Sequence, residues 1–172
     1  MKRVTSTENR VKSPHGAKRK VSLDAVDRTI LRFLINNARM PYLEIARECG
    51  ISGAAIHQRI RRLEEWGVIK GSNLVVDHKA IGLDVCAYIY INMKDTSLVE
   101  QIIEQLKEIP EIAECHMITG PHMVMAKVYC TDNEHLISTL LAIQKIPGIQ
   151  TTETFHSLNV VFSRPANADV CR

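Results

Sequence analysis

The apolar residues that follow residue 21 recur at the spacing of a helix. Asp24 stands where it can cap the first turn, and Asp27 places a negative charge in that turn, where the helix dipole favours it. The pattern ends in the polar run of residues 36–39. We therefore predict one amphipathic helix whose inward side carries Leu23, Val26, Ile30, Phe33 and Leu34.

A second, shorter helix is predicted directly after the first. Pro41 suits its first turn, and the apolar residues Leu43 and Ala46 are expected to point inward. Gly50 is placed to end this helix, because glycine adopts left-handed backbone angles without strain. Ser52 follows as the N-cap of a third helix, so the elements stand in the order of a helix-turn-helix module.

The third helix separates an apolar side from a polar one. At about 100° per residue, Ile56, Ile60 and Leu63 face inward, and the helix ends near Gly67. Glutamine and arginine can pair with adenine and guanine edges in a major groove, and a Ser-capped helix start can hold a phosphate. We expect double-stranded DNA to bind the polar side, which comprises Ser52, Ala54, His57, Gln58, Arg59, Arg61 and Arg62. The alternative is that the arginines only solvate an ordinary surface helix.

The hydrophobic pattern changes after residue 84. Apolar runs predict strands at residues 85–93, 112–119, 123–130 and 150–162, and helical spacing predicts helices around residues 98–109 and 136–143. Two Ile-Pro turns 37 residues apart support two similar βαβ halves. The order β-α-β-β-α-β is that of a ferredoxin-like domain. The predicted fold class is α+β, with an N-terminal winged helix-turn-helix domain and a C-terminal ferredoxin-like domain.

Charge is distributed unevenly along the chain. Residues 1–21 hold seven basic side chains and one acid, whereas the whole chain has a net charge of only +3. Such a polar stretch buries too little apolar surface to order itself, so we expect a disordered basic arm. We expect this arm to touch DNA phosphates through Lys18, Arg19 and Lys20; the alternative is a leader that only aids solubility.

The remaining boundaries follow from these patterns. Residues 68–76 are expected to form a small hairpin or a linking strand. We assign the chain to a DNA-binding domain at residues 22–70, a linker at 71–84, an oligomerisation and effector domain at 85–163, and a tail at 164–172.

The predicted sheet needs a cover on both faces. Residues 86–91 and 124–126 are apolar at successive positions, which is typical of strands buried on both sides. Two helices can cover only one face, so a second copy of the domain is the natural cover for the other. We therefore expect a homodimer, whose two recognition helices would read half-sites about one helical turn (~10 bp) apart or a multiple of it.

Over roughly residues 22–163 the chain resembles the leucine-responsive regulatory protein/AsnC (Lrp/AsnC) family. The likeness rests on Leu23-Asp24 with Asp27 and Ile30-Leu31, Leu43 with Ile45-Ala46, Ile51-Ser52, Arg59-Ile60 with Leu63-Glu64, Gly67-Val68-Ile69, and Glu114-Cys115-His116 with Ile118-Thr119-Gly120. The resemblance implies a sequence-specific transcription regulator that forms homodimers and often octamers. It also implies a small-molecule effector near a loop made of Thr119, Gly120, Pro121, His122 and Met123.

That loop departs from the family pattern. Members usually follow the glycine with an acidic, an aromatic and a second acidic residue, whereas this chain has Pro121, His122 and Met123. Because Met123 stands at the second acidic position, a ligand ammonium group lacks its expected counter-charge. The resemblance therefore disfavours an ordinary amino acid, and favours a different effector or none.

Metal and membrane sites are not expected. Cys115, His116, His122 and Cys130 are of types that bind soft metals, but neighbouring strand residues such as Cys115 and His116 point to opposite faces. We predict no metal and no cofactor. No apolar stretch approaches the ~20 residues that span a bilayer, and the first residues lack a secretory signal. We therefore expect a cytoplasmic, nucleoid-associated protein without a membrane partner.

Two functions from other classes stay open as alternatives. An architectural, chromatin-like protein would use the basic arm to bind DNA with little sequence preference. Sirohaem decarboxylases, which are enzymes, are similar to this family in overall domain plan and act without a competent recognition helix. The sequence has no catalytic nucleophile beside a general base and no glycine-rich phosphate loop, whereas the polar side of its third helix is intact. We therefore predict a regulator and not an enzyme.

Overall fold

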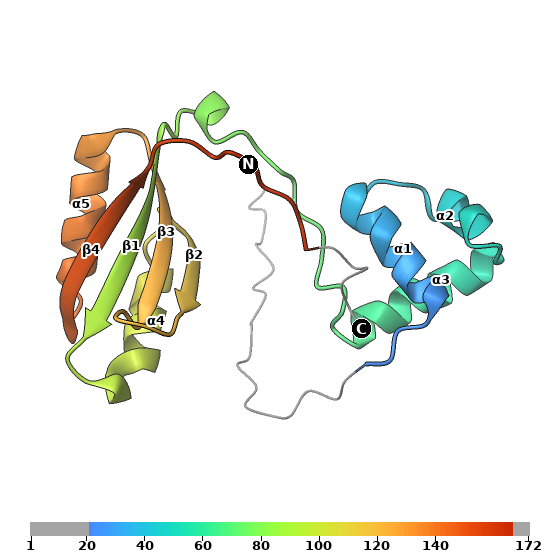
Figure 1. Cartoon of the computed structure of the whole chain (residues 1–172), viewed down its shortest axis with the longest axis horizontal. Coiled ribbons are helices and arrows are strands. Elements are labelled where there is room, and N and C mark those ends of the chain that lie inside the picture. The colour runs from blue at the N-terminus through green and yellow to red at the C-terminus, as the bar shows by residue number, and fades with distance from the viewer. Residues whose placement is uncertain (1–20, 167–172) are drawn as a thin grey trace, which may run out of the picture. The chain divides into compact units, whose positions relative to one another are not determined.

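The computed structural model describes residues 21–166 (Figure 1). The predicted basic arm, with Lys18, Arg19 and Lys20, lies outside the described residues, as do residues 167–172. The described chain divides into two compact units, the first extending to Asn73 and the second running from Leu74 to Arg164. Each unit has its own cluster of buried apolar side chains. The two units are therefore described one at a time.

The first unit consists of three helices: α1 (Ala25–Asn36), α2 (Tyr42–Glu48) and α3 (Gly53–Glu65). A capping box starts α1, because the Asp27 backbone N–H donates to the Asp24 carboxylate at 2.8 Å and the Asp24 N–H donates back to the Asp27 carboxylate at 3.3 Å. Gly50 follows α2 with a φ of 66°, a left-handed conformation that glycine adopts without strain. The predicted helix-turn-helix order is confirmed.

The core of the first unit is built from all three helices. One prediction was wrong: Leu43 is 59% exposed, and Ile45 is buried beside Ala46 instead. In a helix of only two turns, positions two residues apart lie on opposite sides, so the choice of inward residue depends on how the helix is packed. The buried residues of this core are Ile30, Leu31, Ile45, Ala46, Ile56, Ile60 and Leu63.

The segment after α3 differs from the prediction. Residues 68–77 contain neither a hairpin nor a strand, so the expected wing is absent. A strand needs a partner for its backbone hydrogen bonds, and this segment pairs with none of the four strands of the sheet. A short 3-10 turn, η1 (Lys79–Ile81), then ends at Gly82 in the left-handed conformation.

The second unit has the predicted ferredoxin-like order of strands and helices. Its sheet has the strand order β2-β3-β1-β4, and every neighbouring pair is antiparallel. The chain order is β1 (Val85–Met93), a 3-10 turn η2 (Thr96–Leu98), α4 (Val99–Lys107), β2 (Ile112–Met117), β3 (Val124–Cys130), α5 (Asn133–Gln144) and β4 (Ile149–Ser157).

The last strand is shorter than predicted. We expected it to reach residue 162, but it ends at Ser157. Its register explains the end, because Ser157 pairs with Cys86, the second residue of β1. Beyond this point β1 offers almost no further backbone groups for pairing. Residues 158–162 therefore continue as unpaired chain, and four of them are exposed apolar residues: Leu158, Val160, Val161 and Phe162.

Helices α4 and α5 lie on one side of the sheet (Figure 1). Along β1 the side chains alternate between fully buried and half-buried, and Ala87, Ile89 and Ile91 are completely buried on the helix side. Neither α4 nor α5 covers the opposite side (Figure 1). We call this side the open sheet face, and it carries Cys86, Tyr88, Tyr90, Met125 and Phe155.

Candidate nucleic-acid interface

The third helix is fixed at both ends and along one side. The Ser52 hydroxyl oxygen accepts a hydrogen bond from the Ala55 backbone N–H at 3.2 Å, which caps the helix start as predicted. Gly67 follows the helix with a φ of 68°. Ile56, Ile60 and Leu63 are buried in the core of the first unit, as predicted. These contacts determine which side of α3 is left for a partner.

The exposed side of α3 brings together most of the predicted DNA-binding residues. We call this side the recognition surface, and it consists of Ser52, Ala54, His57, Gln58 and Arg61, all of which are exposed. The ring of Tyr42, at the start of α2, meets the His57 ring edge-on with centroids 5.3 Å apart. The surface thus combines a charged donor, an amide, an oriented imidazole and the amino end of a helix.

Arg59 and Arg62 are placed differently from the other predicted residues. Arg59 Nη1 lies 2.6 Å from Asp24 Oδ2 and 2.8 Å from Asp27 Oδ1. Arg62 Nη2 lies 3.0 Å from Asp27 Oδ1 and 2.9 Å from Asp27 Oδ2. Both side chains therefore turn toward the start of α1 and are only partly exposed.

The ion pairs between α1 and α3 shift the ionisation of the groups involved. The hydrogen bond from Arg59 lowers the pKa of Asp24, and the Asp27 backbone N–H lowers it further. The same hydrogen bonds, to Asp24 first and Asp27 second, raise the pKa of Arg59. Both shifts favour the charged forms of Asp24 and Arg59. Arg61 is the arginine of α3 whose side chain faces solvent without one of these acidic partners.

The predicted effector loop lies between β2 and β3. The His122 ring folds against the sheet, with Nδ1 3.3 Å from Asn92 Nδ2 and Nε2 3.5 Å from the Glu153 carboxylate. Met123 is partly buried and packs against the core of the second unit. Within one chain, the exposed residues of the loop are therefore Thr119, Gly120 and Pro121.

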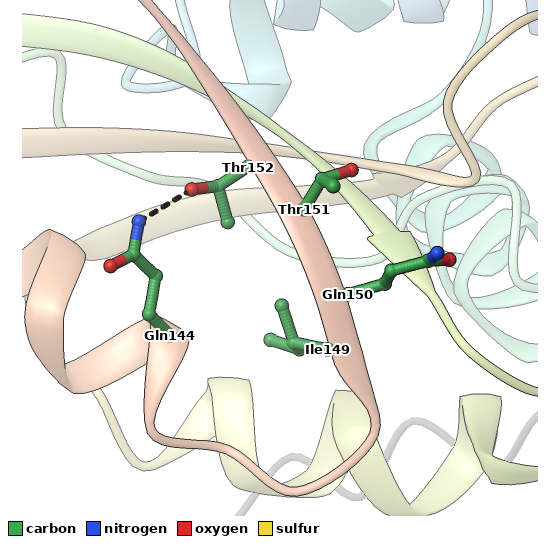
Figure 2. Close-up of a pocket in the computed structure, with 5 residues that line it drawn as sticks. All are labelled: Gln144, Ile149, Gln150, Thr151 and Thr152. Carbon is green, nitrogen blue, oxygen red and sulfur yellow. Dashed lines mark hydrogen bonds between the residues drawn. The ribbon is translucent and has the colours of Figure 1, made fainter.

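A separate hollow lies where α5 ends and β4 begins. Its volume is about 370 Å³, and no residue of the predicted effector loop lines it. Figure 2 shows Gln144 and Thr152 turned toward each other, with Gln144 Nε2 donating to Thr152 Oγ1 at 2.8 Å. The lining is uncharged and consists of Gln144, Ile149, Gln150, Thr151 and Thr152.

Comparison with known proteins gives the chain a family. The AsnC-type helix-turn-helix domain matches residues 23–64, and the Lrp/AsnC ligand binding domain matches residues 86–167. The regulatory protein AsnC of Haemophilus influenzae is 36% identical over 138 residues, which cover 80% of this chain and 92% of that protein. This chain belongs to the Lrp/AsnC family. It is a transcription regulator with a DNA-binding helix-turn-helix domain.

Solved structures of transcription regulators have the same fold. The structure of Escherichia coli AsnC has a TM-score of 0.80 and 32% sequence identity, and the match covers 86% of this chain and 99% of that one. A transcriptional regulator of Neisseria meningitidis, solved as a complex with L-Met, has a TM-score of 0.78 at 21% identity over 83% of this chain and 94% of that one. The predicted family is confirmed, and so is the predicted fold class apart from the wing.

The residues that the structure describes contain neither a cluster of metal ligands nor a helix that could span a membrane. Among residues 21–166, no group of three or more His, Cys, Asp or Glu side chains is arranged to hold a metal ion. Cys115 pairs with Ala126 and His116 with Met125, so the two neighbours face opposite sides of β2, as the sequence predicts. In the same part of this Lrp/AsnC chain, no helix is both long and apolar enough to cross a lipid bilayer.

Proposed function

We propose that the recognition surface of α3 enters the major groove of DNA and reads its sequence. Gln58 and Arg61 are the base-reading residues, because an amide and a guanidinium can each form paired hydrogen bonds with a base edge. Ser52 and the free N–H groups of the first turn hold a phosphate, and Ala54 allows close approach of the helix. His57, oriented by Tyr42, lies at the flank of this surface.

One observation carries this proposal. The three apolar side chains of α3 are buried in the first unit, while Gln58 and Arg61 are exposed on the opposite side of the same helix. A polar, cationic helix face that the fold leaves uncovered is the arrangement by which helix-turn-helix proteins contact bases. The family membership makes the chain a regulator; the residue assignment is our inference.

We propose further that two copies pair through the open sheet face. Phe155 is 54% exposed there, and its ring meets Tyr90 edge-on with centroids 5.3 Å apart. Aromatic residues left uncovered on a sheet are typical of an interface between subunits. A two-fold axis would present two copies of α3 to consecutive turns of the duplex.

The dimer is tested by one substitution and a matched control. Phe155→Glu places a charge on the open sheet face, and we expect it to convert the dimer to a monomer in sedimentation. Ile137→Glu changes a residue of similar exposure, 57%, on α5, which covers the other side of the sheet, and should leave the dimer intact. A Phe155→Glu protein that sediments as a dimer would contradict this interface.

The effector loop is a proposed site for a small molecule. The domain is of the Lrp/AsnC ligand-binding type, and the related Neisseria regulator was solved with L-Met. Because Pro121 and Met123 replace the acidic residues of the family pattern, we propose that the effector is not an ordinary amino acid. We also propose that the chain acts by binding DNA in the cytoplasm, at the nucleoid, and not as an enzyme.

Selection of bound fragments from a pool of random DNA tests the proposed function. We expect the full chain to enrich a two-fold-symmetric motif whose half-sites lie about one helical turn (~10 bp) or a multiple apart. Enrichment without any motif would favour the architectural alternative. The Gln58→Ala variant should relax selection at one or two positions of each half-site and leave the rest of the motif unchanged.

A further inference from the structure

The first unit buries one charged side chain against its apolar core. Asp27 is 1% exposed and is the only charged residue buried among residues 21–166. A carboxylate removed from water is strongly destabilising unless opposite charges and hydrogen bonds surround it. Asp27 receives these from Arg59 and Arg62, whose Nη1 and Nη2 atoms respectively make three contacts of 2.8 to 3.0 Å with its two oxygens.

Asp24 is the second carboxylate in this group of ion pairs. Asp24 accepts one hydrogen bond from Arg59 at 2.6 Å and another from the Asp27 backbone N–H at 2.8 Å. The Arg62 guanidinium also lies 4.6 Å above the ring of Trp66, which follows the end of α3. Two carboxylates and two guanidinium groups thus tie the start of α1 to the middle and end of α3, and their charges cancel.

We infer that Arg59 and Arg62 are positioning residues that set the rotation of α3 and do not contact DNA. The inference rests on the proposed DNA-binding role of the recognition surface. Arg59 and Arg62 are three residues apart and so lie on one flank of the helix, and Gln58 and Arg61 precede each of them by one residue. Because Arg59 and Arg62 are held against α1, the direction in which Gln58 and Arg61 point is fixed.

The buried acid explains why these arginines are not available to phosphates. If Arg59 or Arg62 turned to the DNA backbone, Asp27 would lose half of its charged donors while staying buried. A phosphate contact would have to offset this loss, whereas Arg61 can reach DNA without breaking any of these ion pairs. The cationic contribution of α3 to DNA binding is therefore assigned to Arg61 and not to all three arginines.

The salt dependence of binding distinguishes a positioning arginine from a contacting one. Each lost contact between a cationic side chain and a DNA phosphate lowers the slope of log affinity against log salt by about 0.9. We compare Arg62→Gln and Arg59→Gln with Arg61→Gln as the matched control, in the full chain and on random-sequence duplex. On random-sequence duplex, where Arg61 would contact phosphates, the expected result is an unchanged slope for the first two variants and a slope reduced by about 0.9 per subunit for the third. Equal reductions in all three variants would overturn the inference.

A second variant guards against loss of folding and tests the role of the buried acid. Arg62→Gln alone should lower the preference for a selected site over random DNA by roughly tenfold, because one partner of a buried charge pair is missing. Adding Asp27→Asn removes the buried charge that has lost one of its two guanidinium partners, so the double variant should regain most of that preference. A direct DNA contact of Arg62 could not be restored in this way, and absence of recovery would refute the positioning role. If the unaltered chain prefers no sequence, the proposed function fails, while the slopes on random DNA still decide the role of each arginine.

Discussion

The two separate cores predict that the two units unfold separately. Leu63 is fully buried in the first unit, and Leu→Ala at such a site costs about 2–5 kcal/mol, from lost transfer energy and the cavity left behind. A unit of roughly fifty residues has a total stability of only about 3–8 kcal/mol. Leu63→Ala should therefore leave the helix-turn-helix unit close to its unfolding midpoint at 37 °C, while the sheet unit is unaffected.

The assay is denaturant unfolding of the full chain followed by two probes. The fluorescence of Trp66, at the end of α3, reports the first unit, and the sedimentation coefficient of the dimer reports the second. Leu63→Ala should shift the fluorescence transition alone and weaken DNA binding at 37 °C. The matched control is Ile102→Ala in α4, which is equally buried in the core of the sheet unit and should shift the other transition alone. If either variant moved both transitions together, the chain would unfold as one cooperative unit and the reasoning would be refuted.

Three further outcomes follow from single contacts. Ser52→Ala should cost about 1 kcal/mol in denaturant unfolding of the first unit, because the cap of α3 is lost, and a stability equal to the parent would contradict the capping role. The hydrogen bond from His135 lowers the pKa of Glu111 in the folded protein. This contact should therefore stabilise the sheet unit at pH values above the usual Glu pKa, and the stabilisation should be lost as the pH falls through the lowered pKa. Glu111→Gln should reduce the pH dependence of the unfolding midpoint in that acidic range. Gly148→Ala should cost about 1–3 kcal/mol, because φ is 98° and the new Cβ would lie 2.9 Å from Leu98 Cδ1, and an unchanged midpoint would refute this crowding.

Most of the fold could be predicted because local patterns and tertiary packing agree. The inward residues of α3, the cap at Ser52 and the bounds of β1 follow from periodicity and capping chemistry, and the structure has them as predicted. The errors fall where a residue's state depends on a distant partner. Residues 158–162 have strand composition, but β1 has almost ended where they begin. Residues 68–76 likewise have no strand to pair with.

The ion pairs of α3 could not be predicted from helical periodicity. A helical wheel places Arg59 and Arg62 at the flank of the polar side, where DNA contact and solvation are both reasonable. Their partners lie 32 to 35 residues away on α1, and this proximity exists only after the helices pack. Asp24 and Asp27 are visible in the sequence, but helix capping and the helix dipole already explain both acids. No local pattern therefore indicated that they also pair with the arginines of α3.

Coupling between Arg61 and a guanine tests most directly whether the recognition surface reads DNA. In a selected half-site, each guanine is replaced in turn by 7-deazaguanine, which lacks the N7 acceptor, and affinity is measured for the unaltered chain and for Arg61→Ala. If Arg61 binds a guanine edge, one replacement costs the unaltered chain about 1–3 kcal/mol and costs the variant almost nothing. If every replacement costs both proteins the same, Arg61 does not read a guanine, and the proposed orientation of α3 in the major groove is contradicted.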